Sequence, residues 1–210
     1  ECIPSYYPAE NNSNCYLSNE ILDGYYFNIV KFSLCYHSCS RCSNSGDTIT
    51  HNCLVCATNF YPIQEVNSIQ CYTRDFPLLY YTFVISSNNF VRCYSSCLTC
   101  NEVGNDNTHK CTTCDNNFYP LIDNPSQCYL KETTIENYFY DNTIGKFNLC
   151  YISCKYCNGS GVDVDHNCIA CNNNYYALVD NSKQCYKSDH ILVKYYFDSA
   201  LLVFNKCYMS

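Results

Sequence analysis

The sequence has few basic residues and no long apolar run. Its 210 residues include 12 Lys and Arg against 19 Asp and Glu, which gives a formal net charge of −7. A nucleic-acid-binding surface needs clustered positive charge to neutralise phosphates, so nucleic acid is not an expected partner. No stretch reaches the roughly 18 consecutive apolar residues of a membrane-spanning helix, and we expect no membrane span in these residues.

The chain also has little aliphatic material from which to build one large core. Hydrophobic residues make up 47% of it, but this share includes 21 Cys and 23 Tyr. Without these two residue types about a quarter of the chain is apolar, which is thin for a single core. Something other than a hydrophobic interior must stabilise the fold.

Motifs of common enzymes are missing as well. The sequence contains no G-x-S-x-G, H-E-x-x-H, G-x-x-x-x-G-K or G-x-G-x-x-G segment. A cysteine nucleophile would need a free thiol near a base, and Cys207 is the only candidate. We therefore expect neither enzymatic activity nor a cofactor.

Cysteine, in contrast, is abundant, at one residue in ten. This level is typical of small secreted domains in which disulfides replace a large hydrophobic interior. The cytosol would keep such thiols reduced. The cysteine content therefore predicts an extracellular or cell-surface protein.

The cysteines recur with a period of about 57 residues. Cys35, Cys93, Cys150 and Cys207 are 58, 57 and 57 residues apart. Each complete unit reads C-Y-x2-C-x2-C-x10-C-x2-C, and after 13 or 14 intervening residues a sixth cysteine follows, again with Tyr after it. The period predicts an elongated, rod-like array of tandem repeats, each of which contacts mainly its neighbours.

We place the domain boundaries at the first cysteine of each unit. The segments are residues 1–34, which hold the end of a leading repeat and a connector, the repeats 35–92, 93–149 and 150–206, and residues 207–210, which begin a further repeat. Because both ends fall inside a unit, we expect the polypeptide to continue into further repeats, with Cys207 unpaired in this stretch. The alternative is a Cys207 that is free or bonds another molecule.

Aromatic residues follow the same period. Phe32, Phe90, Phe147 and Phe204 each stand three residues before an opening cysteine, and Tyr follows the first and sixth cysteines throughout. A carbohydrate- or partner-binding stripe is one interpretation. We favour packing against the disulfides and the next repeat, because a small repeat buries its apolar face by stacking.

Secondary structure should be sparse, with short β-hairpins, loops and little helix. Aromatic and β-branched segments broken by Asn, Asp and Gly predict hairpins such as residues 138–140 turning through 141–145 into 146–151. Gly46, Gly104 and Gly161 share one position in the loop before the fourth cysteine, where we expect a positive φ.

Disulfides can hold such hairpins together. A closed loop near 15 residues contributes about 3 kcal/mol in the chain-entropy model. Six cysteines allow fifteen pairings, so the spacing alone leaves the connectivity open.

The cysteine pattern of the three complete units and the two partial ones resembles the furin-like, growth-factor-receptor cysteine-rich repeat. Repeats of this family occur in receptor ectodomains, R-spondins and long surface proteins of single-celled eukaryotes. The resemblance implies a one-three, two-four, five-six pairing. The implied disulfides are Cys2–Cys15, Cys35–Cys42, Cys39–Cys53, Cys56–Cys71, Cys93–Cys100, Cys97–Cys111, Cys114–Cys128, Cys150–Cys157, Cys154–Cys168 and Cys171–Cys185.

Zinc binding is a competing interpretation of the same cysteines. The four central cysteines of each unit have the ligand count of a tetrahedral site, and His51, His109 and His166 recur two residues before the fourth cysteine. Four ligands would leave the first and sixth cysteines stranded, so we expect no metal. We expect these histidines to bond backbone groups instead. Asp163 and Asp165 suggest calcium only weakly, because the other units lack the pair.

Two sequons fit exposed loops of a secreted protein. They begin at Asn11 and Asn158, and N-linked glycans are the expected modification there.

The regularity of the repeats points to a structural role. We expect a surface-coat or fibre-forming glycoprotein that associates with itself or continues into further repeats. The alternative is a receptor or adhesin ectodomain in which one repeat binds a protein or carbohydrate ligand.

Overall fold

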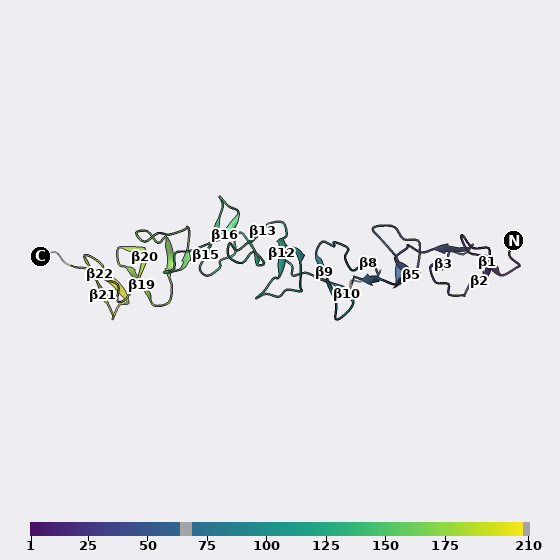
Figure 1. Cartoon of the computed structure of the whole chain (residues 1–210). Coiled ribbons are helices and arrows are strands. Elements are labelled where there is room, and N and C mark those ends of the chain that lie inside the picture. The colour runs from purple at the N-terminus through teal and green to yellow at the C-terminus, as the bar shows by residue number, and fades with distance from the viewer. Residues whose placement is uncertain (64–68, 208–210) are drawn as a thin grey trace. The chain divides into compact units, whose positions relative to one another are not determined.

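The computed structural model describes residues 1–63 and 69–207 of the chain. These residues form short antiparallel hairpins and loops and contain no helix (Figure 1). Ten disulfides join the hairpins within tandem repeats. The predicted fold class of small disulfide-rich repeats is therefore confirmed. No helix among the described residues is long and apolar enough to cross a membrane.

The chain divides into two compact units, and the division crosses the second repeat. One unit comprises residues 1–94 and 99–104, and the other comprises residues 95–98 and 105–210. Each disulfide lies within one of them. Three kinds of hairpin alternate along the chain.

The first kind, the cysteine hairpin, has a C-x2-C sequence on each strand. Its strands are β5 (Cys39–Cys42) with β6 (Cys53–Cys56) and β17 (Cys154–Cys157) with β18 (Cys168–Cys171), and the corresponding strands of the middle repeat are β11 (Cys97–Cys100) and β12 (Cys111–Cys114). Cys39 lies opposite Cys56 in the β5–β6 ladder, but its disulfide partner is Cys53. The disulfides therefore add links that the strand register alone does not provide.

The second kind, the tyrosine hairpin, ends at the sixth cysteine and its tyrosine. Its strands are β1 (Tyr6–Pro8) with β2 (Cys15–Leu17), β7 (Phe60–Pro62) with β8 (Cys71–Thr73), β13 (Phe118–Pro120) with β14 (Cys128–Leu130), and β19 (Tyr175–Leu178) with β20 (Asn181–Lys187). In each of these hairpins, the first strand begins with two aromatic residues. The residue just before it has a positive φ, as at Asn59, Asn117 and Asn174. Asn tolerates this conformation better than most residues, which suits the Asn-rich turns.

The third kind, the connector hairpin, precedes each opening cysteine. Its strands are β3 (Tyr25–Phe27) with β4 (Phe32–Leu34), β9 (Tyr81–Val84) with β10 (Asn89–Arg92), β15 (Tyr138–Asp141) with β16 (Lys146–Leu149), and β21 (Tyr195–Asp198) with β22 (Val203–Lys206). The hairpin predicted over residues 138–151 is confirmed as β15 and β16.

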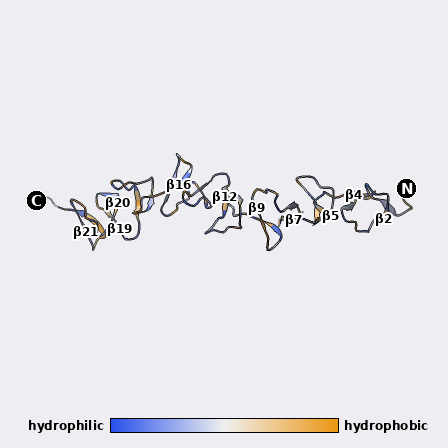
Figure 2. Ribbon diagram, in the orientation of Figure 1, coloured by the Kyte–Doolittle hydropathy of each residue, from blue (hydrophilic) through white to orange (hydrophobic). Residues whose placement is uncertain are grey.

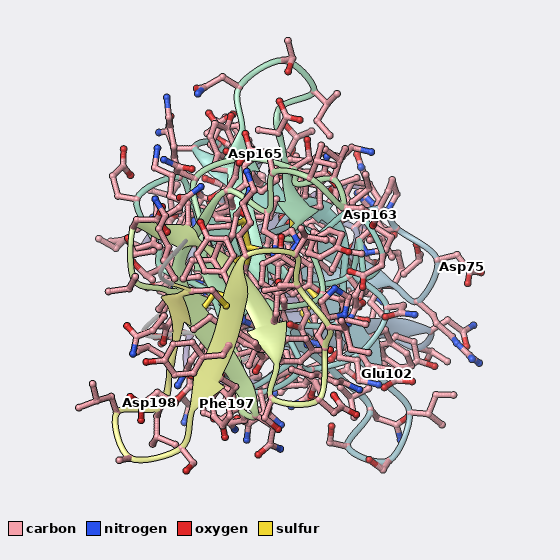
Figure 3. The ribbon with its side chains drawn as sticks, turned by 90° about the vertical axis from the view of Figure 1, so that its left-hand side faces the viewer. Asp75, Glu102, Asp163, Asp165, Phe197 and Asp198 are labelled. Atoms are coloured by element: carbon pink, nitrogen blue, oxygen red, sulfur yellow. A yellow bond between two sulfur atoms is a disulfide. The ribbon has the colours of Figure 1, made fainter. Side chains whose placement is uncertain are left out.

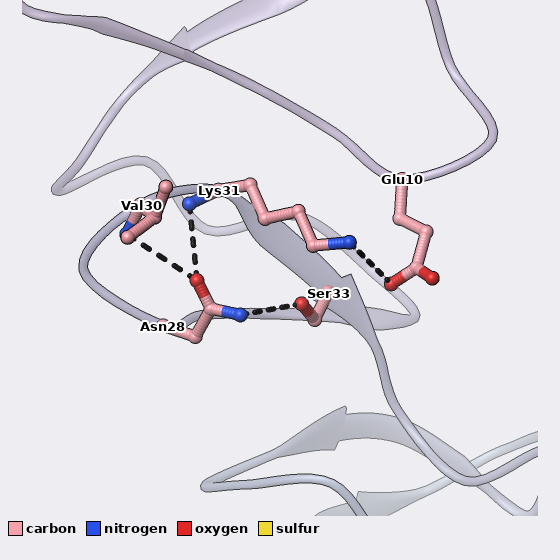
Figure 4. Close-up of polar contacts among 5 residues, drawn as sticks. All are labelled: Glu10, Asn28, Val30, Lys31 and Ser33. Carbon is pink, nitrogen blue, oxygen red and sulfur yellow. Dashed lines mark hydrogen bonds and ion pairs between the residues drawn. The ribbon is translucent and has the colours of Figure 1, made fainter.

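Polar side chains close the turns of the connector hairpins. In the β3–β4 turn, Asn28 Oδ1 accepts the backbone N–H groups of Val30 and Lys31, and Asn28 Nδ2 donates to Ser33 Oγ at 2.7 Å (Figure 4). Lys31 also reaches Glu10 of the preceding tyrosine hairpin at 3.5 Å. Asp198, at the equivalent position in the last connector, likewise accepts two backbone N–H groups of its turn.

Each connector hairpin packs on the tyrosine hairpin before it. Phe147 and Phe204 are 1% exposed, and Phe32 and Phe90 are 2% exposed. A parallel bridge links Leu121 to Phe147, and in the last repeat the same bridge joins β19 to β22 in a four-stranded sheet.

Each buried phenylalanine belongs to a cluster of four aromatic rings and contacts two of them directly. Around Phe147 the ring centroids of Tyr140 and Tyr129 lie at 5.5 and 6.2 Å, and Tyr119 lies 4.7 Å from Tyr140. The sets are Tyr7, Tyr16, Phe27 and Phe32; Tyr61, Tyr72, Phe83 and Phe90; Tyr119, Tyr129, Tyr140 and Phe147; and Tyr176, Tyr186, Phe197 and Phe204. These residues pack, as predicted, but the rings of each set belong to one repeat and contact one another instead of the next repeat.

The core is therefore divided into many small clusters. In one class, disulfides supply the buried residues, as in Cys39, Cys42, Cys53 and Cys71. In the other class, aromatic rings form the cluster around the buried phenylalanine. Figure 2 shows that strongly hydrophobic residues occupy only short stretches of the ribbon, as expected of a chain without one large interior.

Candidate functional site

The disulfides are the first feature that defines each repeat. The structure pairs Cys2–Cys15, Cys35–Cys42, Cys39–Cys53, Cys56–Cys71, Cys93–Cys100, Cys97–Cys111, Cys114–Cys128, Cys150–Cys157, Cys154–Cys168 and Cys171–Cys185. These are the pairs that the furin-like resemblance implies. Cys207 is exposed and free within the described residues.

A buried serine and histidine lie at the centre of each complete repeat. Ser38 Oγ lies 3.0 Å from His51 Nδ1, and the two residues are 1% and 3% exposed. The same Nδ1 accepts the backbone N–H of Cys71 at 3.0 Å. The equivalent groups are Ser96, His109 and Cys128 in the second repeat, and Ser153, His166 and Cys185 in the third.

These contacts assign the protonation state of the histidine. Because Nδ1 accepts a backbone N–H, it carries no proton, and the neutral ring holds its proton on Nε2. Ser38 Oγ donates its proton to Nδ1, since its other neighbour, the disulfide sulfur of Cys53, is farther away at 3.9 Å. Burial lowers the pKa of His51, His109 and His166 below the ordinary 6.5 because it disfavours the charged form.

The serine and histidine pair resembles a nucleophile and base, but its surroundings suit a structural role. Ser38 is almost fully enclosed, and the lone pair of His51 Nδ1 is shared with the Cys71 amide. The oxidised Cys39 Sγ lies 3.3 Å from the His51 carbonyl oxygen and has no proton to donate. The pair therefore links β8 to the segments that lead into β5 and β6. The prediction that these histidines bond backbone groups is confirmed.

Tyrosine rings enclose each buried imidazole. The Tyr151 ring stacks on His166 with centroids 4.2 Å apart, and Tyr186 contacts the imidazole at 4.8 Å. Tyr186 also meets Phe204 of the following connector at 6.2 Å. One tyrosine thus links the disulfide core of a repeat to the aromatic cluster beyond it.

A pocket opens beside the histidine in the first and third repeats. In the third repeat it has a volume of about 460 Å³, and its walls include Tyr151, Asp163, His166 and Tyr186. In the first repeat the equivalent pocket measures about 260 Å³. The fold thus forms a hollow at the same place, but its size differs between repeats.

The loop glycines of the cysteine hairpins have a different role from the predicted one. Gly46 and Gly161 do not have a positive φ, so that expectation was wrong for them. A Cβ on Gly161 would instead collide with the His166 carbonyl group and lie 2.7 Å from Tyr151 Cβ. Glycine is needed there because the loop backbone passes directly against the buried histidine.

Metal ligands are scarce among the described residues. Every cysteine of the zinc interpretation is bonded in a disulfide, which leaves no thiolate to bind zinc. The described residues contain no group of three or more His, Cys, Asp or Glu side chains able to hold a metal. Asp163 and Asp165 both lie on the loop before β18 (Figure 3), where Asp163 accepts the Tyr151 hydroxyl at 2.7 Å.

Both predicted glycosylation sites are accessible. Asn11 and Asn158 are exposed, and each lies in a loop outside the strands. Their geometry is compatible with glycan attachment.

The sequence analysis did not assign a role to two recurring polar residues. The serine before the second cysteine and the glutamine before the sixth occur in all three repeats. Gln70 Nε2 donates to the Ile49 carbonyl at 2.9 Å, and Gln70 Oε1 accepts the Tyr72 hydroxyl. Their constant distance from cysteines was the signal that could have revealed them.

Comparison with protein families, curated proteins and solved structures finds no match to this chain. The resemblance to furin-like repeats therefore stays a prediction. The ten disulfides indicate folding in an oxidising environment and suggest an extracellular protein.

Proposed function

We propose that the chain belongs to an extracellular structural protein, a surface-coat or fibre-forming glycoprotein without catalytic activity. The observation that carries this proposal is the constancy of the internal contacts. The serine–histidine distance is 3.0, 3.0 and 2.9 Å in the three repeats, and each connector buries its phenylalanine to 2% exposure or less. Such constancy favours a role that every repeat performs alike.

Crosslinking suits this role. Disulfides restrict the unfolded chain, and each closed loop of 14 or so residues contributes about 3 kcal/mol in the chain-entropy model. Two of the three disulfides in a repeat close loops of this length, and the third joins cysteines seven residues apart. Together they hold the loops of the repeat in place and limit access by proteases. A furin-like ancestry, self-association and N-linked glycans on Asn11 and Asn158 are parts of the same proposal.

Electron microscopy of the native material tests it. We expect filaments or a surface layer with a regular axial repeat, and mass mapping of the non-reduced protein should recover the ten disulfides. Dispersed monomers under the same conditions would contradict the proposal. Treatment with an amidase that removes N-glycans should convert Asn11 and Asn158 to Asp if they are occupied.

A receptor or adhesin ectodomain is the second candidate. One observation favours it: the side chains around the pocket of the third repeat differ from those of the first. In a purely structural array, no repeat needs a lining of its own.

A further inference from the structure

The pocket of the third repeat has the size of a small-molecule site. Its volume of about 460 Å³ falls within the range of roughly 300–1,000 Å³ that is usual for ligand pockets. The equivalent pocket of the first repeat, at about 260 Å³, falls below it. Both are built against a buried histidine by the same disulfide core, so the difference comes from the lining side chains.

Four lining positions distinguish the third repeat from both other repeats. One of them, Ile152, replaces the polar His37 of the first repeat and Ser95 of the second. The other three are Tyr175, Lys187 and His190. The corresponding residues are Phe60, Thr73 and Phe76 in the first repeat, and Phe118, Leu130 and Thr133 in the second. At these three positions the third repeat has a phenol, an ammonium group and an imidazole. The other two repeats have no charged group there and no ring that can donate a hydrogen bond.

The added groups are arranged among aromatic rings. His190 stacks on Tyr186 with centroids 5.0 Å apart and an interplanar angle of 20°. Lys187 Nζ lies 5.8 Å from the Tyr175 ring centroid. Asp163, which also lines the pocket, accepts the Tyr151 hydroxyl at 2.7 Å. The lining therefore combines ring faces with hydrogen-bonding groups.

The charges of the lining select the class of ligand. Asp163 and Asp189 are acceptors, whereas Lys187 is a donor, so the lining carries charges of both signs and a charged ligand is repelled by part of it. A neutral ligand with hydroxyl groups can both donate to the carboxylates and accept from the ammonium group. Its C–H face can lie on the aromatic rings.

We propose that the pocket of the third repeat binds a neutral saccharide. This inference goes beyond the structural role, which does not depend on it, and it would give the second candidate function a ligand class. An open site with few polar contacts binds a small ligand weakly, so we expect a Kd in the millimolar range, roughly −4 kcal/mol.

Nuclear magnetic resonance on the oxidised chain provides the test. The probes are lactose, cellobiose and N,N′-diacetylchitobiose, with glucosamine and glucose 6-phosphate as charged comparisons. We expect saturation transfer to at least one neutral probe and chemical-shift changes on Tyr175, Tyr186 and His190. Binding of the charged probes alone, shift changes elsewhere, or no binding at all would overturn the proposal.

A swap between repeats supplies the matched control. The triple variant Y175F/K187T/H190F carries the residues of the first repeat at these three positions, where the same core already accommodates them. We expect its affinity to fall at least tenfold, while its disulfide map and circular dichroism stay unchanged. Retained affinity would overturn the proposal. If the variant fails to fold, the wild-type shift map still decides between the outcomes. None of these results bears on the filament test.

Discussion

At the scale of single residues, the histidine beside the disulfides is the most constrained group. His51, His109 and His166 are 2–3% exposed, and each accepts a backbone N–H from the strand that carries the sixth cysteine. A charged imidazole could not accept that hydrogen bond. The fold therefore requires the neutral ring.

This requirement makes stability depend on pH. Burial lowers the pKa of His166 in the folded state, so the unfolded chain binds more protons, and stability rises with pH. The contribution is complete above the unfolded pKa of about 6.5 and is lost as the pH falls below it. We expect the Cys185 amide to be protected from hydrogen exchange at about pH 7.5 and less protected at about pH 5.5.

Exchange rates corrected for their intrinsic pH dependence measure this effect. The window separates the histidines from the carboxylates, which titrate near pH 4. Equal protection of the Cys185, Cys71 and Cys128 amides at both pH values would contradict the assignment of neutral histidines.

A glycine pair tests the close approach of the loop to His166. Gly161→Ala places a methyl group against the His166 carbonyl and 2.7 Å from Tyr151 Cβ, so we expect a loss of about 1–3 kcal/mol or more from overpacking. Gly159→Ala is the control, because its nearest atom would be Asn167 Nδ2 at an ordinary 3.9 Å. Denaturant titration of the oxidised variants measures the difference. Equal stability of the two variants would show that the loop can shift to accept the methyl group without a loss of stability.

At the scale of elements, the connector hairpin depends on the tyrosine hairpin before it. The two share few main-chain bonds, such as Ile122 N–H to the Phe147 carbonyl at 2.9 Å. Side-chain contacts supply the remaining interactions between the two hairpins. Tyr138 donates its hydroxyl to Asp123 at 2.8 Å, and burial together with that carboxylate raises the pKa of Tyr138 to about 12. An isolated two-stranded hairpin is marginal in water, so these contacts hold it in place.

Removing the Phe147 ring should detach the connector hairpin from the tyrosine hairpin before it. Phe147→Ala deletes a side chain that is 1% exposed, and core Phe→Ala changes cost about 3–5 kcal/mol. We expect limited proteolysis to cleave the variant within residues 130–150 faster than it cleaves the wild type there. Leu149→Ala on the same strand is the control, because Leu149 is 44% exposed. Cleavage of both variants at the same rate would contradict a specific role of Phe147.

The hairpins could be predicted from the sequence because their signals are local. Tyr138 to Tyr140 and the turn after them lie within one short stretch, and the aromatic period showed which residues pack. The serine–histidine bond could not be predicted, because Ser38 and His51 are 13 residues apart and nothing in a loop serine indicates burial. Gly46 was misjudged for a related reason. Its constraint comes from a distant backbone group rather than from its own φ. The elongated array stays a prediction.

At the scale of the whole molecule, covalent bonds replace a large interior. The ten disulfides lie in or beside clusters that each contain only a few buried residues. Small domains that lack a sufficient core usually depend on such links. Loss of the links should therefore affect the entire chain.

Reduction should unfold the chain, whereas chelation should not. We expect an excess of dithiothreitol to abolish the near-ultraviolet circular dichroism and to add two hydrogen atoms for each of the ten disulfides. Removal of native disulfides typically costs 2–5 kcal/mol each. Incubation with EDTA is the control. Unchanged dichroism after complete reduction would show that the aromatic clusters alone maintain the fold.

The hydrogen bond that ties each connector to its opening cysteine has a consequence for length. Cys35, Cys93, Cys150 and Cys207 each donate their backbone N–H at 2.8 Å to the residue that precedes the connector. Every junction therefore uses the same main-chain hydrogen bond. Excising residues 93–149 would set Arg92 before Cys150, which carries the same local sequence pattern as Cys93. We therefore expect gene duplication or loss to change the number of repeats in steps of one period. Each resulting chain would keep the same hydrogen bond at the junction between neighbouring repeats.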